Sequence, residues 1–311
     1  MSFLHDRYSM SQMTPMARRT LKSSITAMGR GLHSGLDVHL TLCPAALNAG
    51  IVFRRADLGT EIKARFDTVS DTRLCTLISS GAAKIGTIEH LMAALAAAGV
   101  DDAVVEVDGP ELPVFDGSSA AFLFLIESAG VVEHGGARAV LEILRPVRVE
   151  RGDAFAELHP QRVGQSGFDL SLAIEFQAQA IGRQAYQFHF SAEGFADEIA
   201  RARTFTLRQE IETLHKAGLA RGGSLANAVV VDEDKILNPE GLRFDDEFVR
   251  HKLLDVIGDL YLAGAPICGR FIGHRTGHEL NNQLLHAVFS DQANYRLATN
   301  ALAAPLQLTA A

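Results

Sequence analysis

The sequence has few of the features that mark secreted, membrane-spanning and nucleic-acid-binding proteins. Its three cysteines, Cys43, Cys75 and Cys268, lie far apart in 311 residues and lack C-x-x-C spacing, which excludes a disulfide framework and predicts a reducing, cytoplasmic setting. No apolar stretch approaches the roughly 20 residues of a membrane-spanning helix, and the N-terminal residues contain no apolar run of signal-peptide length. The net charge of −8 argues against nucleic acid as a partner, because neutralising phosphates requires a basic surface.

What is present is the composition of an ordinary soluble globular protein. Apolar residues make up 47% and charged residues 21% of the chain, which argues against a largely disordered protein. A chain of 311 residues exceeds the roughly 100–150 residues that one domain usually contains. We therefore expect two domains. We also expect a monomer.

In the first half, strand patterns precede helix patterns. Residues 19–58 alternate apolar and polar side chains between Gly, Pro and Asn boundaries, which predicts antiparallel strands. In residues 87–100 the apolar side chains recur at i, i+3, i+4 and i+7, which predicts a helix ending at Gly99. A strand at 101–109 and a second helix, with Ser118 as its N-cap and Gly130 past its end, complete the first α+β domain, residues 16–130.

The second half shows the same order of predicted strands and helices. Residues 131–138 (VVEHGGAR) read as a linker, and residues 139–300 again give strands, then helices, including a strongly apolar-striped helix within 247–264. We predict two related α+β domains with helices covering one face of each sheet. Residues 1–15 and 301–311 are expected to be flexible ends.

His251 and Asp255 are four residues apart on this predicted helix, so their side chains leave the same face one turn apart. An imidazole and a carboxylate at that spacing suit a zinc ion, although a surface His–Asp pair is the commoner meaning of such spacing. Asp259 lies one further turn along the same stripe.

Three other segments contain histidines that could act in a site. Glu89 and His90 open the helix of residues 87–100, and adjacent helical residues diverge by about 100°. They either divide metal binding and base chemistry between them, or form an exposed Glu beside a capping or buried His. His278 at a helix start either faces a cleft or simply begins that helix, and the glycine-flanked His33 either approaches a ligand closely or lies in a hairpin loop.

Taken together and in order, these segments resemble one family, the zinc-dependent UDP-3-O-acyl-N-acetylglucosamine deacetylases of lipid A synthesis. The matching blocks include RTLKSSITAMGRGLHSG, GTIEHLMAALAAAGVDDAVVEVDGPELPVFDGSSAAF, ARTF, GLARGGSLANAVVVDEDKILNPEGLRFDDEFVRHKLLDVIGDLYLAG and GHELNNQLL. The resemblance covers residues 18–290, nearly the whole chain.

The resemblance implies a catalytic site. Zn²⁺, or Fe²⁺ in the same place, would be held by His90, His251 and Asp255 with a fourth position open, the arrangement of catalytic zinc. Glu89 would be the general base and His278 its cationic partner. The remaining catalytic residues would be Asp259, which orients His278, and Thr204 beside the reacting carbonyl.

It also implies a substrate and a fold. The substrate-binding residues would be Leu32, His33, Lys252 and Phe205, with Ile211 and Leu225 lining an acyl-chain passage in an insert at about 206–237. The fold would be two similar domains, each a sheet layered with helices, whose helical layers face each other. The reaction would be hydrolysis of the N-acetyl group of UDP-3-O-acyl-N-acetylglucosamine, a metalloamidase reaction. The alternatives are a zinc amidase with another substrate and an inactive module that binds a nucleotide-sugar lipid.

Overall fold

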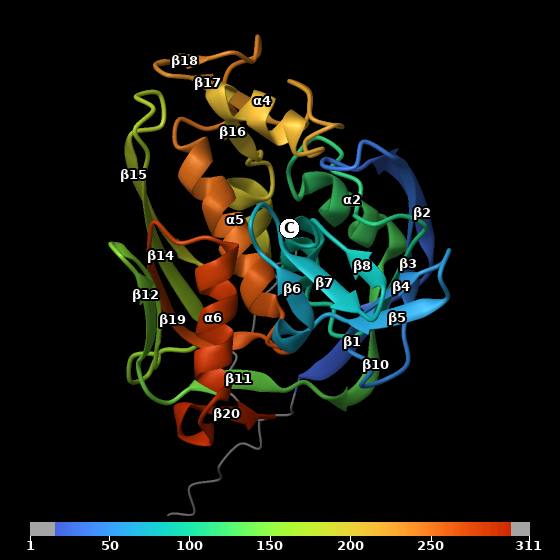
Figure 1. Cartoon of the computed structure of the whole chain (residues 1–311). Coiled ribbons are helices and arrows are strands. Elements are labelled where there is room, and N and C mark those ends of the chain that lie inside the picture. The colour runs from blue at the N-terminus through green and yellow to red at the C-terminus, as the bar shows by residue number, and fades with distance from the viewer. Residues whose placement is uncertain (1–15, 300–311) are drawn as a thin grey trace, which may run out of the picture.

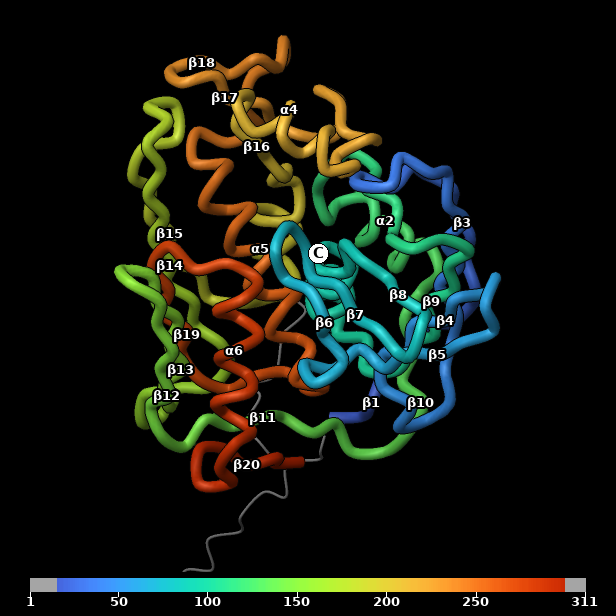
Figure 2. The backbone as a smooth tube through the Cα atoms, viewed as in Figure 1, coloured from blue at the N-terminus to red at the C-terminus, as the bar shows by residue number. Residues whose placement is uncertain are grey.

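The computed structural model describes residues 16–299, and the expected flexible ends lie outside this range. The chain forms four layers, with a β-sheet on each outer side and the helices between them (Figure 1). The α+β sandwich predicted from the sequence is confirmed. The N-terminal half, blue to green, forms one side of the molecule and the C-terminal half, green to red, the other (Figure 2).

The first sheet has the strand order β2-β3-β9-β4-β5. Its strands are β2 (Ile25–Arg30), β3 (Asp37–Pro44), β4 (Ile51–Arg55), β5 (Thr60–Lys63) and β9 (Ala103–Val107). All neighbours are antiparallel except β4 and β9, which run parallel. The parallel pair requires a crossover, and the helix predicted at residues 87–100 lies in it.

The second sheet repeats this connectivity. Strands β12 (Val147–Arg151), β13 (Ala154–His159), β14 (Phe168–Glu175), β15 (Arg183–His189) and β19 (Ile267–His274) lie in the order β12-β13-β19-β14-β15. Among these five strands only β14 and β19 are parallel neighbours. In both halves the last strand inserts between the second and third, so the two halves share one topology. The sheet also carries β11 (Val140–Ile143) and β20 (Tyr295–Ala298), and the 3₁₀ turn Gln292–Asn294 precedes β20.

Each half carries an insertion between its fourth strand and the helix that follows. The first is a three-stranded sheet of β6 (Val69–Asp71), β7 (Leu77–Ser80) and β8 (Ala83–Ile85), preceded by the 3₁₀ turn Phe66–Thr68. The second joins parallel strands β16 (Phe205–Leu207) and β17 (Val229–Asp232) through α4 (Arg208–Lys216) and adds β18 (Lys235–Ile236). This second insertion is a βαβ unit at the position where the sequence predicted an insert.

The four long helices are α1 (Glu89–Ala98), α2 (Ala120–Ala129), α5 (Glu247–Tyr261) and α6 (His278–Phe289). Gly99 ends α1 as predicted, since its φ of 67° is a left-handed conformation that glycine adopts without strain. Ser119, rather than the predicted Ser118, is the N-cap residue of α2. Residues 192–199 form only a short helical turn, α3 (Ala192–Gly194), and a π-helical turn, Phe195–Ile199.

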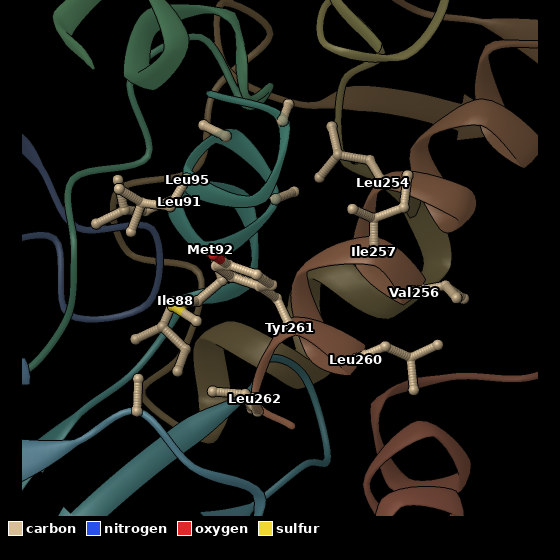
Figure 3. Packing of buried hydrophobic residues seen from close by; sticks show 14 of the residues in the cluster. Ile88, Leu91, Met92, Leu95, Leu254, Val256, Ile257, Leu260, Tyr261 and Leu262 are labelled. Carbon is tan, nitrogen blue, oxygen red and sulfur yellow. The ribbon is translucent and has the colours of Figure 1, made fainter. Parts of the chain in front are cut away.

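Helices α1 and α5, one from each half, pack directly against each other. Figure 3 shows α1 and α5 side by side, with Met92 of α1 and Tyr261 of α5 between them, and both side chains are buried. Burying each such side chain contributes about 1.5–3 kcal/mol. The helices approach closely because Gly258 has no side chain, and a Cβ at this position would lie 2.0 Å from the carbonyl oxygen of Glu89.

Within the predicted linker at 131–138, residues Val131–Ala137 form strand β10, antiparallel to β1 (Ala17–Leu21). The register shifts around Arg18 show why this strand is hard to recognise, since its glycine pair, Gly135 and Gly136, lies in an irregular part of the ladder. The pairing ties the start of the first half to its end.

Within residues 16–299, no helix has the length and apolar character needed to cross a membrane.

Candidate metal centre and catalytic cavity

The N-terminus of α1 brings two adjacent polar residues into the protein interior. Glu89 and His90 are each 3% exposed, which answers the question left open by the sequence in favour of burial for both. The preceding residue, Thr87, has a φ of 56°, an unusual conformation for a β-branched residue. This sharp turn after β8 starts α1 at the depth where Glu89 and His90 face α5.

The opposite wall is α5, which carries three buried polar residues on one stripe. His251, Asp255 and Asp259 are each 2% exposed and follow one another at one-turn intervals. The stripe faces α1 because the neighbouring apolar residues of α5 pack into the helical layer. The two halves of the chain therefore meet at this stripe.

His90, His251 and Asp255 bring their potential ligand atoms within 4.8 Å of one another. Asp255 Oδ1 lies 3.4 Å from His251 Nε2 and 3.7 Å from His90 Nε2. Ligands about 2.0–2.1 Å from a tetrahedral ion are roughly 3.3–3.5 Å apart, so these spacings suit one. No other group of three such residues is found in the described part of the chain.

The hydrogen bonding around these three residues also fits a metal ion. Asp255 Oδ1 is buried and has no hydrogen-bond partner, a costly state unless a cation binds there. His251 Nδ1 lies 3.0 Å from the carbonyl oxygen of Ala202, and donation to that carbonyl leaves Nε2 with its lone pair toward Asp255. Lys252 Nζ donates to the other oxygen, Asp255 Oδ2, at 2.9 Å.

The electrostatics keep these groups in their ligating forms. Burial and the neighbouring His251 imidazole lower the pKa of His90 to about 3, and burial also lowers the pKa of His251. Burial opposes the ionisation of Asp255, but Lys252 and His251 hold its pKa well below the usual range. Two neutral imidazoles and one carboxylate are the protonation states that metal binding requires.

A second set of polar residues surrounds Glu89. His278, the first residue of α6, places Nε2 3.9 Å from Glu89 Oε1 and Nδ1 2.9 Å from Asp259 Oδ2. Burial raises the pKa of Glu89 to about 7, with Asp255 and Asp259 adding to it and His278 opposing it. Burial alone would lower the pKa of His278, but Asp259 and Glu89 raise it to about 9. The pair can therefore hold a base and a cationic acid side by side near neutral pH.

These groups open onto a cavity of about 570 Å³. The sequence-predicted residues that line it are Leu32, His33, Glu89, His90, Thr204, Phe205, His251, Lys252, Asp255 and His278. They come from both halves of the chain, and the first insertion adds Thr72 to Cys75 to the lining. Asp259 lies behind His278 and is not part of the lining.

Thr204 and Phe205 are placed by backbone contacts and by aromatic packing. The Thr204 N–H donates to the carbonyl of Gly117 at 2.8 Å, and its carbonyl accepts from Val229 at 2.8 Å. The Phe205 ring packs edge-on against Phe248 of α5, with ring centroids 4.9 Å apart. The segment is thus fixed to both halves of the chain.

An ion pair that was not predicted from the sequence holds this segment. Arg203, 1% exposed, donates through Nε and its backbone N–H to Glu247 Oε1, at 2.8 and 2.9 Å. Glu247 is the first residue of α5, so the pair fixes the Thr204 segment relative to the helix that carries His251. Nothing in the local sequence indicates this pairing, because the partners are 44 residues apart.

Glu111 was also missed, and it holds the loop that carries His33. Its carboxylate accepts from the backbone N–H groups of His33 and Ser34 and from the Ser34 hydroxyl. Both ring nitrogens of His33 are buried without partners, and burial lowers the pKa of this imidazole. His33 therefore presents a neutral ring to the cavity.

The two residues predicted to line an acyl passage do not line this cavity. Ile211 is half-buried on α4, and Leu225 is 39% exposed in the loop before β17. Leu207 and Glu210, from the same insertion, are the lining residues instead. Position 207 ends β16, which runs directly from Phe205 in the cavity wall, whereas Ile211 lies a full helical turn further on. The roles of Ile211 and Leu225 stay predictions.

Comparison with known proteins shows similarity over nearly the whole chain. Residues 18–290 match the family model of UDP-3-O-acyl N-acetylglycosamine deacetylase. A relative from Idiomarina loihiensis, named UDP-3-O-acyl-N-acetylglucosamine deacetylase, is 49% identical over 91% of this chain and 92% of its own. Proteins of the same name from Shewanella frigidimarina and Neisseria meningitidis are 47% and 46% identical, over 91% and 90% of this chain and 92% of their own lengths.

Proposed function

The chain belongs to the UDP-3-O-acyl-N-acetylglucosamine deacetylase family, and from this we propose how its own residues carry out the reaction. The enzyme hydrolyses the N-acetyl group of UDP-3-O-acyl-N-acetylglucosamine to give UDP-3-O-acyl-glucosamine and acetate, the committed step of lipid A synthesis. The observation that carries the proposal is the convergence of Glu89, His278 and the His90–His251–Asp255 group on one buried cavity.

We propose that His90, His251 and Asp255 hold the metal. Two imidazole nitrogens and one carboxylate oxygen suit Zn²⁺ and also Fe²⁺, and we assign Zn²⁺. When bound, the ion would supply Lewis acidity toward both water and the amide carbonyl. Lys252 fixes the second oxygen of Asp255 and lines the cavity, where its ammonium can also contact the anionic substrate.

Glu89 acts as the general base. Its pKa of about 7 lies close to working pH, which favours proton acceptance from water followed by proton release. The Thr204 hydroxyl donates a hydrogen bond to the oxyanion that develops on the acetyl carbonyl. The protonated His278, held through Nδ1 by Asp259, stabilises that charge and gives its proton to the departing sugar amine.

Leu32, His33 and Phe205 form the part of the cavity that we assign to the acylated sugar nucleotide. Phe205 offers an aromatic edge beside His251, with ring centroids 6.3 Å apart. We propose that Leu207 begins the apolar surface for the acyl chain and that Ile211 and Leu225 extend it. We also propose that the enzyme is a cytoplasmic monomer. All three cysteines are free thiols, which supports a reducing compartment.

The test compares Glu89→Gln and His278→Gln with Glu127→Gln and His286→Gln, whose side chains are exposed and lie outside the cavity. The two site variants are expected to keep one metal ion per chain and to lose at least about 100-fold in acetate release. The two control variants are expected to retain full activity. An active Glu89→Gln protein would remove the base assignment.

A second comparison separates the rival functions. Removing the 3-O-acyl chain from the substrate should strongly reduce kcat/KM for this enzyme, whereas an amidase for another substrate would not distinguish the two compounds. Metal-loaded protein that binds the acylated substrate without releasing acetate would identify an inactive binding module.

A further inference from the structure

Thr76 is a buried residue that touches both halves of the proposed catalytic machinery without lining the cavity. It is 1% exposed and lies in the first insertion, directly before β7. The four residues before it, Thr72 to Cys75, line the cavity, but Thr76 does not. Its contacts are therefore with the protein and not with substrate.

The first contact is with the N-terminus of α1. The Thr76 N–H donates to Glu89 Oε2 at 3.0 Å, and its carbonyl accepts from the Ile88 N–H at 3.4 Å. With Oε2 held, Glu89 presents Oε1 toward His278 Nε2, 3.9 Å away. The backbone of Thr76 thus sets which carboxylate oxygen faces the reacting groups.

The second contact is with α5. The Thr76 hydroxyl donates to Asp259 Oδ1 at 2.5 Å, while Oδ2 of the same carboxylate accepts from His278 Nδ1 at 2.9 Å and from Asn281 Nδ2 at 2.8 Å. Asp259 is 2% exposed, so no water replaces a lost donor. Without the hydroxyl, Oδ1 is left unsatisfied, and rotating the carboxylate to satisfy it breaks a bond on Oδ2.

We propose that Thr76 is a positioning residue that fixes Glu89 and the Asp259–His278 pair relative to each other. One residue of the first half holds the base through its backbone and the orienting carboxylate of the second half through its side chain. The proposal rests on the proposed roles of Glu89, Asp259 and His278. It assigns to Thr76 an effect on turnover and none on substrate binding.

The contact of the Thr76 hydroxyl with Asp259 can be removed while the backbone contact with Glu89 is kept. Thr76→Val keeps the β-branched shape and the backbone N–H to Glu89 but removes the hydroxyl, and Thr76→Ser restores the hydroxyl. The matched control is Thr20→Val, because Thr20 is 5% exposed and its hydroxyl also makes two hydrogen bonds, a buried one to the Asp102 carbonyl and a partly buried one from the Ala45 N–H. Thr20 lies outside the cavity lining.

Thr76→Val is expected to lower kcat about tenfold or more, the loss of one hydrogen bond to a charged group, with KM and metal content unchanged. Thr76→Ser should stay within about twofold of the unmodified protein, and Thr20→Val should keep its kcat whatever its melting temperature. On an Asp259→Asn background, Thr76→Val should add little, because both changes act on the same contact. Should Thr76→Val not fold, Thr76→Ala makes the same comparison.

A readout independent of turnover is the NMR signal of the His278 Nδ1–H proton in the metal-free protein. It should shift in Thr76→Val and return to its original position in Thr76→Ser. An unchanged kcat in Thr76→Val, an equal loss in Thr20→Val, or full additivity with Asp259→Asn would each overturn the proposal. If the unmodified protein released no acetate, the proposed function would fail, while the NMR comparison would still decide the role of Thr76.

Discussion

Replacing Asp259 by Asn tests how the protein keeps His278 cationic. The change is isosteric and removes one negative charge from the buried network. The asparagine oxygen can still accept from His278 Nδ1 and Asn281, and its amide can donate to the Thr76 hydroxyl, which is able to accept as well as donate. The network therefore keeps its shape while its charge changes.

The expected magnitude follows from the environment of His278. Its pKa is raised from 6.5 to about 9 although burial acts to lower it, and at 1.36 kcal/mol per pKa unit this is about 3 kcal/mol in favour of the cation. Without the Asp259 charge the strongest contact that raises this pKa is lost, while Glu89 and Asp255 still favour the cation, so the pKa of His278 should fall below 9. A fall of about one to two units would lower the protonated fraction at pH 8 from about nine-tenths to between about a half and a tenth, so kcat should fall about two- to tenfold.

The free energy of unfolding depends on pH through His278 with a sign opposite to that of a carboxyl group whose pKa is lowered by folding. Because the folded pKa of His278 is raised, the protonated imidazole stabilises the fold fully below pH 6.5, and this contribution is lost as the pH rises through about 9. The metal-free protein should accordingly lose up to about 3 kcal/mol of unfolding free energy across this range. The Asp259→Asn protein should lose much less.

Two measurements check the reasoning. One is the pH–rate profile of the metal-loaded enzyme, whose alkaline limb should move to lower pH in Asp259→Asn, and the other is an NMR titration of the His278 ring in the metal-free protein. Asp246→Asn, at the start of the same helix, is the control, since asparagine also caps helices well. An alkaline limb and a His278 titration that are the same in Asp259→Asn as in the unmodified protein would refute the argument.

Three further outcomes are expected. Gly258→Ala should cost about 1–3 kcal/mol of unfolding free energy and reduce activity, because its Cβ would meet the Glu89 carbonyl at 2.0 Å; chemical denaturation and acetate release measure both. Removing the metal with a chelator should abolish acetate release and lower the melting temperature, with both restored by Zn²⁺, since Asp255 Oδ1 is otherwise buried without a partner. Glu111→Gln should raise KM severalfold more than it lowers kcat, because the carboxylate holds the His33 loop through three hydrogen bonds; steady-state kinetics with the acylated substrate would expose a purely structural role if both constants stayed unchanged.

Local sequence patterns predicted the long helices well, because the face of a helix is set by residues three and four positions apart. The spacing of His251, Asp255 and Asp259 placed these side chains on one stripe, and the structure has them there, each 2% exposed. Glycine at position 99 ended its helix as expected. The sequence does not indicate that the predicted linker contains strand β10, because the pairing of this strand with β1 depends on residues more than 100 positions away and not on its own alternation.

The site was harder to infer from spacing than from resemblance to a family. Adjacent residues such as Glu89 and His90 could be read as exposed or as buried, and only the close approach of α5 at Gly258 buries both. Thr76 had no local signal at all, since its partner Asp259 is 183 positions away. Ile211 and Leu225 lie in the insert that the family resemblance implies, and an apolar character by itself does not fix the direction of a side chain.

The sequence by itself determined the periodic elements, the two-part organisation and the chemical types of the ligand atoms, because these depend on residue identity and short-range spacing. The tertiary structure decided which of these atoms meet. Burial of Glu89, the raised pKa of His278 and the convergence of the potential ligand atoms of His90, His251 and Asp255 all arise where α1 and α5 pack together. Their pKa values and distances depend on that contact between distant segments, so no single segment of the sequence determines them.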